Sequence, residues 1–82
     1  MLMGKVVGHI VSTRKNEDIV GFKILEIQLV KNQVETDDYI VAVDSVGAGI
    51  GESVLITTGS GARLALNNPA TPVDAVVVGI ID

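Results

Sequence analysis

Short runs of β-branched and aliphatic residues alternate with polar, glycine-rich segments along the whole chain. In the run FKILEIQLV, the apolar residues Leu25, Ile27 and Leu29 alternate with Glu26 and Gln28. This period of two indicates a β-strand with one buried face. Five runs of this kind predict five strands, at Met3–Ser12, Phe22–Val30, Tyr39–Val43, Ser53–Thr58 and Ala75–Ile81.

The last of these runs is apolar on both faces. Val77 and Ile81 point to one side, while Val76, Val78 and Ile80 point to the other. A strand buried on both sides fits a barrel wall whose outer face is covered by a neighbour.

Two glycines and one short helical segment complete the predicted elements. Gly8 and Gly79 lie inside strands, where glycine often marks a bulge or the bend that closes a barrel. Ser60–Leu66 has good helix formers, with Ser60 as the expected N-cap and an Asn-Asn-Pro sequence after it. The pattern predicts a single all-β domain over residues 1–82, an OB-like closed barrel of five strands with one short helix.

The composition adds an apolar surplus to this picture. Of the 82 residues, 48% are hydrophobic, yet the only aromatic residues are Phe22 and Tyr39. A domain of this size buries a modest core, so the surplus favours an obligate oligomer, with a dense aliphatic core as the alternative. Cysteine is absent and His9 is the only histidine, which excludes disulfides and multi-histidine metal sites within one chain. We expect neither a metal nor a cofactor.

The charge balance restricts the partners. Six basic residues against ten acidic ones give a net charge of −4, which argues against binding to a phosphate backbone. Two aromatic residues also offer little for base stacking. We therefore expect no nucleic-acid partner. Neither a signal peptide nor a membrane-spanning run is visible, so the expected location is the cytoplasm, with no membrane partner.

The segment DSVGAGIGESV places Gly47, Gly49 and Gly51 at alternate positions. A dinucleotide-binding fingerprint needs a different spacing before a helix, and a P-loop needs Gly-Lys-Ser/Thr. Here a predicted strand follows, and the residue after Gly51 is Glu52, which would repel a phosphate. We interpret the segment as a connection in which glycine allows positive φ and close approach of another backbone, as at a symmetry axis.

No set of residues indicates catalysis. Asp44 and Glu52 flank the glycines, and paired carboxylates can act as acid and base, but no nucleophile accompanies them. We expect both to accept hydrogen bonds from N–H groups of the loop, as Asp does in turns. His9 is expected to be a packed or interface residue. The protein is therefore not expected to be an enzyme.

Four segments together resemble a known family, the pentameric vertex proteins of bacterial microcompartment shells, or EutN/CcmL family. The segments are GKVVGHIVSTRKN, GFKILEIQLV, YIVAVDSVGAGIGESVLITTGSGAR and PVDAVVVGIID. They follow the family's order and spacing over essentially the whole chain. His9 and Gly61 depart from the family's usual residues, a small polar residue and a serine.

The resemblance implies a five-stranded barrel that assembles as a homopentamer and caps the five-fold vertices of a shell in the bacterial cytoplasm. Hexameric shell proteins of another fold would tile the facets. The family's members are structural and not known as enzymes. The alternative, which rests on fold analogy alone, is a barrel that binds a small ligand or single-stranded nucleic acid.

The resemblance also assigns positions to individual residues. The axis of the pentamer would be lined by Gly47, Ala48, Gly49, Ile50, Gly51 and Glu52. Subunit contacts, or support for the same region, would come from Thr13, Lys15, Asp44, Ser60, Ala62 and Arg63. For Arg63 the alternative is an exposed surface cation, and for Thr13 and Lys15 a solvated loop.

Overall fold

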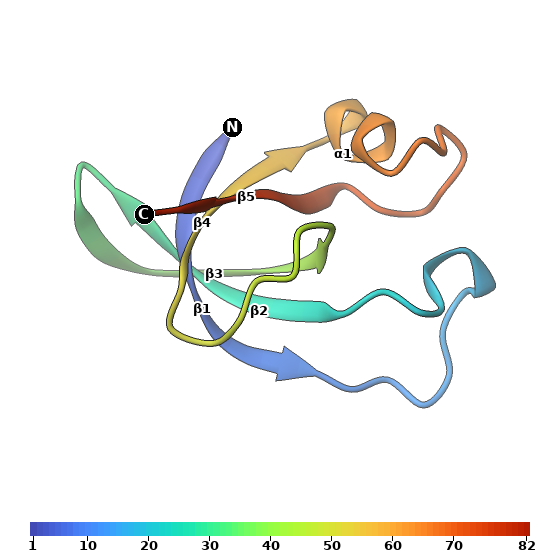
Figure 1. Ribbon diagram of the computed structural model, residues 1–82, viewed down its shortest axis with the longest axis horizontal. Helices are drawn as coiled ribbons and strands as arrows, with labels where there is room; N and C mark the ends of the chain where they lie inside the picture. Colours follow the sequence, from blue (N-terminus) through green and yellow to red (C-terminus); the bar gives the residue numbers. More distant parts are fainter.

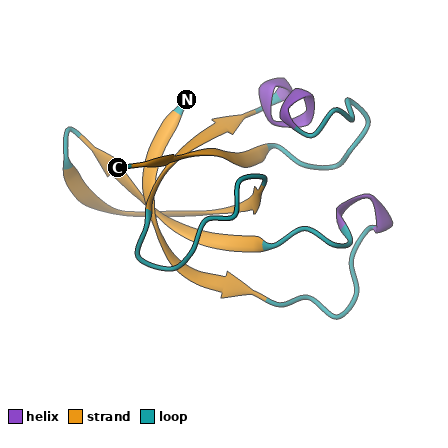
Figure 2. Cartoon of the chain, viewed as in Figure 1, coloured by secondary structure: helices purple, strands orange, loops and turns teal.

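The computed structural model describes residues 1–82, and its five strands close into a barrel (Figures 1 and 2). The strands are β1 (Leu2–Ile10), β2 (Ile24–Lys31), β3 (Val34–Asp44), β4 (Ser53–Thr58) and β5 (Ala75–Ile81). Two short helices, the 3-10 helix η1 (Glu17–Ile19) and the α-helix α1 (Ser60–Ala65), lie in the connections. The order around the barrel is β1-β2-β3-β5-β4, and all pairs are antiparallel except β3–β5. The predicted fold class is confirmed.

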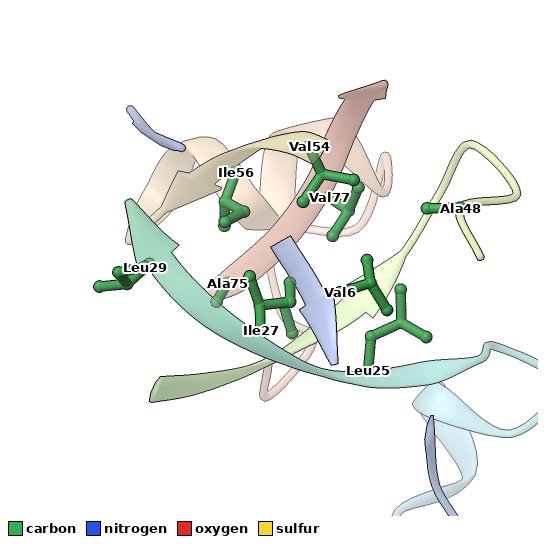
Figure 3. Close-up of a cluster of buried hydrophobic side chains, with 10 residues drawn as sticks. Val6, Leu25, Ile27, Leu29, Ala48, Val54, Ile56, Ala75 and Val77 are labelled. Carbon is green, nitrogen blue, oxygen red and sulfur yellow. The ribbon is translucent and has the colours of Figure 1, made fainter. Parts of the chain in front are cut away.

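The barrel interior is filled by aliphatic side chains from all five strands and one loop (Figure 3). The predicted inner face of β2 is correct, because Leu25, Ile27 and Leu29 are all buried whereas Glu26 is exposed. The complete cluster contains Val6, Leu25, Ile27, Leu29, Ala42, Ala48, Val54, Ile56, Ala75 and Val77.

A second, smaller cluster lies outside the barrel wall. Val43 and Val76 of neighbouring strands pack there against Ala62 of α1 and Val73. This explains why β5 is apolar on both faces: one face fills the barrel, and the chain's own helix covers the start of the other. The register shift between Leu55 and Ile56 reverses the predicted faces at the end of the strand: Ile80 is paired with the buried Val54 and Ile81 with Ser53 on the outer wall. Both isoleucines remain 37% exposed.

The strand β3 is longer than predicted, beginning at Val34 instead of Tyr39. Its first part is polar and carries no apolar alternation, so the pattern could not reveal it. Pairing forms it instead: β2 and β3 make a hairpin across a two-residue turn at Asn32 and Gln33, both with positive φ. At a register shift after Gln28, the backbone carbonyl of Thr36 accepts a hydrogen bond from the Gln28 side-chain amide. The Thr36 hydroxyl donates a second hydrogen bond to Leu29 O. The hairpin projects from one end of the barrel (Figure 1).

Three further elements differ from the prediction in their bounds, and β1 also begins one residue earlier, at Leu2. β1 ends at Ile10 instead of Ser12, and β2 runs from Ile24 to Lys31 rather than from Phe22 to Val30, because cross-strand pairing starts at the Ile10–Ile24 pair. The helix ends at Ala65, one residue before the predicted end.

The predicted N-cap of the helix is wrong. Gly59 occupies the N-cap position with φ 63°, and no side chain caps the helix. The chain leaves β4 at Thr58 and must reverse within one residue to start α1, which a left-handed glycine permits. The Gly59 N–H donates to Asp74 O at 2.8 Å and thereby holds the reversal against the segment before β5.

Both predicted strand glycines lie at irregular positions of the barrel. The register of β1 against β2 shifts between Val6 and Gly8. The register of β4 against β5 shifts beside the Leu55–Gly79 pair. Such shifts bend and twist a strand, which helps five short strands to close. Neither helix is long and apolar enough to cross a membrane.

Candidate functional site

The segment Ser45–Glu52, called the glycine loop below, carries the chain from β3 to β4. Its two ends are fixed to other strands. Ser45 donates to Val77 O through both its backbone N–H and its hydroxyl, at 3.2 and 2.6 Å. Gly51 N–H donates to Val6 O at 2.8 Å, and Val6 N–H donates to Glu52 O at 3.0 Å. The loop therefore continues the hydrogen bonding of the barrel rather than hanging free.

Asp44 organises the first half of the glycine loop. Its carboxylate is buried and accepts hydrogen bonds from the backbone N–H groups of Val46, Gly47 and Ala48, at 3.0 to 3.1 Å. Lys23 lies 4.0 Å from the same carboxylate and donates to Ala48 O at 2.7 Å. A buried carboxylate is stable when N–H donors and a cation surround it in this way.

Glu52 closes the second half of the loop. Its Oε1 accepts the Gly49 N–H at 2.7 Å, and its own N–H donates to Gly49 O at 3.1 Å. The expectation that Asp44 and Glu52 accept loop N–H groups is thus confirmed. Both carboxylates stabilise the backbone, which is not the arrangement of an acid–base pair facing a substrate.

The three glycines of the loop differ in what they need. Gly47 and Gly51 have φ of 83° and 92°, a conformation that side chains with a Cβ rarely adopt. Gly49 has no positive φ, and an added Cβ would make an ordinary contact at 3.5 Å with Glu52 Oε1. The prediction of positive φ is therefore right for two of the three, and nothing within one chain requires glycine at 49.

The side chains of the loop point in opposite directions. Ala48 is fully buried and belongs to the core cluster, whereas Ile50 and Val46 are 62% and 41% exposed. The loop is thus anchored by a small side chain inside the barrel and presents two aliphatic side chains outside. Exposed aliphatic residues on a rigid loop are typical of an interaction surface.

The other predicted site residues lie on two separate segments. Thr13 and Lys15 are exposed in the connection after β1, and the Lys15 ammonium donates to Ser12 O at 3.0 Å. Ser60 and Arg63 are on α1, which lies apart from that connection in Figure 1. The Arg63 guanidinium makes no hydrogen bond or ion pair within the chain. Ala62 is buried under α1 and packs within its own chain.

Lys23 and Gly4 matter to the structure but were not predicted from the sequence. Lys23 holds the glycine loop from a position 25 residues away from the carbonyl that it binds. Gly4 is buried where β1 passes close to β2. Neither position has a local signal, since both depend on contacts made across the barrel.

The surface offers little for chemistry on a small molecule. No three His, Asp or Glu side chains gather as metal ligands would. One hollow of about 270 Å³ is lined by residues without a titratable group: Met3, Gly4, Val30, Gln33, Ser53 and Ile81. A second, of about 250 Å³, is lined in part by His9, Lys15 and Lys23, with no carboxylate beside them.

Comparison with known proteins accounts for this architecture. The family model described as "Ethanolamine utilisation protein EutN/carboxysome" matches residues 1–82. The chain belongs to the EutN/CcmL family. A curated member is the carboxysome shell vertex protein CcmL of Gloeobacter violaceus, 46% identical over all of this chain and 83% of CcmL. The microcompartment shell vertex protein GrpN of Rhodospirillum rubrum is 43% identical over all of this chain and 93% of GrpN.

Solved structures of EutN/CcmL proteins have the same backbone. The Gloeobacter violaceus CcmL structure superposes with a TM-score of 0.93, covering all of this chain and 86% of that one. A structure described as the pentameric microcompartment shell protein GrpN of Rhodospirillum rubrum superposes with a TM-score of 0.90, at 42% identity over all of this chain and 94% of that one. Family membership favours a structural role over a ligand- or nucleic-acid-binding barrel.

Proposed function

We propose that this chain assembles as a homopentamer that caps the vertices of a bacterial microcompartment shell. The observation that carries the proposal is full-length similarity, in sequence and in backbone, to a pentameric shell protein. The relatives are named as shell vertex proteins in both carboxysomes and other microcompartments, so the protein is a structural subunit and not an enzyme.

We further propose that the glycine loop faces the five-fold axis. Its backbone is fixed by Asp44 and Glu52, which gives five loops the rigidity to meet around a narrow opening. Gly49 supports this position, because its lack of a side chain has no reason within one chain and acquires one if a second backbone approaches it. Ile50 would then lie at the axis or at the contact between adjacent loops.

The remaining partners follow from the role. A closed shell needs flat facets between its vertices, and we propose that hexameric shell proteins supply them and border the pentamer. Ser60, Arg63, Thr13 and Lys15 are proposed as contacts between subunits, and the unpaired Arg63 guanidinium suits a bidentate bond to a carboxylate across that boundary. We place the shell in the bacterial cytoplasm.

Native mass spectrometry of the purified protein tests the assembly. The expected species has five times the chain mass of 8.5 kDa and five times the formal charge of −4. Because a pentamer would bury apolar surface that one chain exposes, the complex is expected to persist at micromolar concentration. A chain that is monomeric under native conditions would contradict the proposed function.

A Gly49→Leu variant tests the position of the glycine loop. We expect the isolated chain to fold as the wild type does, because a Cβ at position 49 would contact only Glu52 Oε1, at 3.5 Å. Five leucines crowded at an axis should instead weaken assembly or close the axial opening. Native mass and the structure of the assembled ring measure the two effects, and far-ultraviolet circular dichroism checks the fold.

Gly49→Ala is the matched control, since a single methyl group fits beside Glu52. It should leave assembly close to that of the wild type. If Gly49→Leu forms the pentamer with an unchanged axial structure, the loop does not lie at the axis.

A further inference from the structure

The outer wall of the barrel has two separate apolar patches. Pairing register shows which residues share the outer face, since directly opposed side chains lie on the same side of a sheet. The β3 patch consists of Ile10, Ile24, Tyr39 and Val41. The β1–β4 patch consists of Met3, Val30, Leu55 and Ile81.

The β3 patch covers the wall where β1, β2 and β3 run side by side. Ile10 is paired with Ile24, and Tyr39 and Val41 stand on the same face of β3 two residues apart. Their partners on β2 are polar, Gln28 opposite Tyr39 and the exposed Glu26 opposite Val41, and they border the patch. Tyr39 and Val41 are 53% and 52% exposed. The hydroxyl of Tyr39 has no hydrogen-bond partner within the chain.

The β1–β4 patch lies at the opposite ends of β1 and β2 and continues onto β4 and β5. Met3 is paired with both Val30 and Leu55, and its side chain is 42% exposed. Beside Met3 is the hollow of about 270 Å³, which Val30 and Ile81 also line. Lys5 and Gln28 are paired with each other and lie between Met3 and Tyr39, since Gln28 is also the cross-strand partner of Tyr39.

The amount of exposed apolar surface suits two interfaces per chain. Fifteen large apolar side chains are exposed on a total surface of 5022 Å², and five of them lie in the two patches: Met3, Ile10, Tyr39, Val41 and Ile81. The other three patch residues, Ile24, Val30 and Leu55, are half-buried. An ordinary protein interface takes roughly 800 Å² from each partner, so two would cover about a third of this surface. A soluble monomer rarely leaves such contiguous patches open to water.

Ring symmetry determines how two patches are used. In a cyclic ring of more than two copies, each subunit offers one surface to the copy ahead and a different surface to the copy behind. This inference rests on the proposed pentamer. We propose that the β3 patch of each chain docks on the β1–β4 patch of the next copy, with Tyr39 seated in the hollow beside Met3.

Tyr39 is the anchor of this contact. It is the only tyrosine of the chain, and a half-exposed tyrosine beside aliphatic residues combines a large apolar area with few rotatable bonds. The hollow has no charged lining, so it accepts the ring, while the hydroxyl can reach Ser53 or Gln33 at its rim. Interface energy is concentrated in such central aromatic residues.

Engineered cysteines test the pairing directly, because the natural chain has none. In the double variant Met3→Cys with Val41→Cys, oxidation should link neighbouring chains into a ladder that ends at five. Either single variant should give no covalent dimer, because residues of the outer barrel wall, away from the axis of a head-to-tail ring, do not lie next to their own copies in adjacent chains. Denaturing electrophoresis without reductant reads the result.

Tyr39→Asp tests the anchor, with Val34→Asp at the exposed hairpin tip as the matched control. We expect Tyr39→Asp to lower the association constant of each interface by about 30-fold or more and to yield folded monomers. Val34→Asp should remain pentameric. Circular dichroism establishes that both variants keep the barrel.

The outcomes separate this pairing from the proposed function. A pentameric wild type whose double-cysteine variant forms no ladder, or a pentameric Tyr39→Asp, overturns the pairing and leaves the vertex role standing. Covalent dimers from a single-cysteine variant also overturn it, since they require Met3 or Val41 to lie next to its own copy instead of next to the other patch. A monomeric wild type contradicts the vertex role and the pairing together.

Discussion

Replacing Gly4 with alanine is expected to destabilise the barrel by about 2–3 kcal/mol, the cost of overpacking a dense core. A Cβ at this position would collide with Ile27 Cγ2 and would lie 2.8 Å from the backbone carbonyl oxygen of Gln28. Ile27 is fully buried and the carbonyl belongs to the β1–β2 ladder, so neither can yield without moving the strands. The effect comes from close approach of two backbones and not from the conformation of the glycine.

Thermal unfolding measures this effect. For a domain of this size, the expected loss lowers the melting temperature by roughly 10–20 °C. Gly8→Ala on the same strand is the matched control, because a Cβ there meets only Glu26 Oε1 at 3.8 Å. That variant should melt close to the wild type. Equal melting of Gly4→Ala and the wild type would contradict the close approach of β1 and β2.

Replacing Asp44 with alanine is expected to cost about 3 kcal/mol and to release the glycine loop. The change removes the acceptor of three backbone N–H groups and leaves the Lys23 ammonium without its carboxylate. The Ala48 N–H is buried and those of Val46 and Gly47 are part-buried, and a donor left unpaired away from water costs more than the net value of the bond that it made. If the glycine loop lines the axis, the variant should also lose the pentamer.

Hydrogen exchange of the loop amides and chemical denaturation measure the two parts of this result. The amides of Gly47 and Ala48 should lose protection first, because their acceptor is gone. Asp38→Ala serves as the control. The Asp38 carboxylate is exposed, and its single ion pair, with Lys31 at 3.8 Å, is a surface pair worth less than about 1 kcal/mol. A stable Asp44→Ala with protected loop amides would show that the loop is held by other bonds.

The sequence determined much of the barrel, because its strands bury one face against the core. Alternation in β2 predicted the inner positions of Leu25, Ile27 and Leu29, and the limits of β4 and β5 were correct. Where burial does not control pairing, prediction failed. The polar start of β3 forms through a hairpin turn and through a hydrogen bond from Thr36. Neither depends on alternating apolar residues, so the hydrophobic pattern does not reveal this part of the strand.

The site shows the same division. The residues and spacing of DSVGAGIGESV already excluded a phosphate-binding motif. They also predicted that Asp44 and Glu52 accept hydrogen bonds from loop N–H groups, because both features depend on residues close together in the sequence. The need for glycine at position 4 and the bond from Lys23 to Ala48 came only from the tertiary structure. The two apolar patches came from it as well, since closing the barrel brings Met3 beside Leu55, far along the chain, and turns both outward. The period of the sequence determines which side chains share a face of one strand. Which strands then become neighbours, so that their faces form one surface, is decided only when the barrel closes.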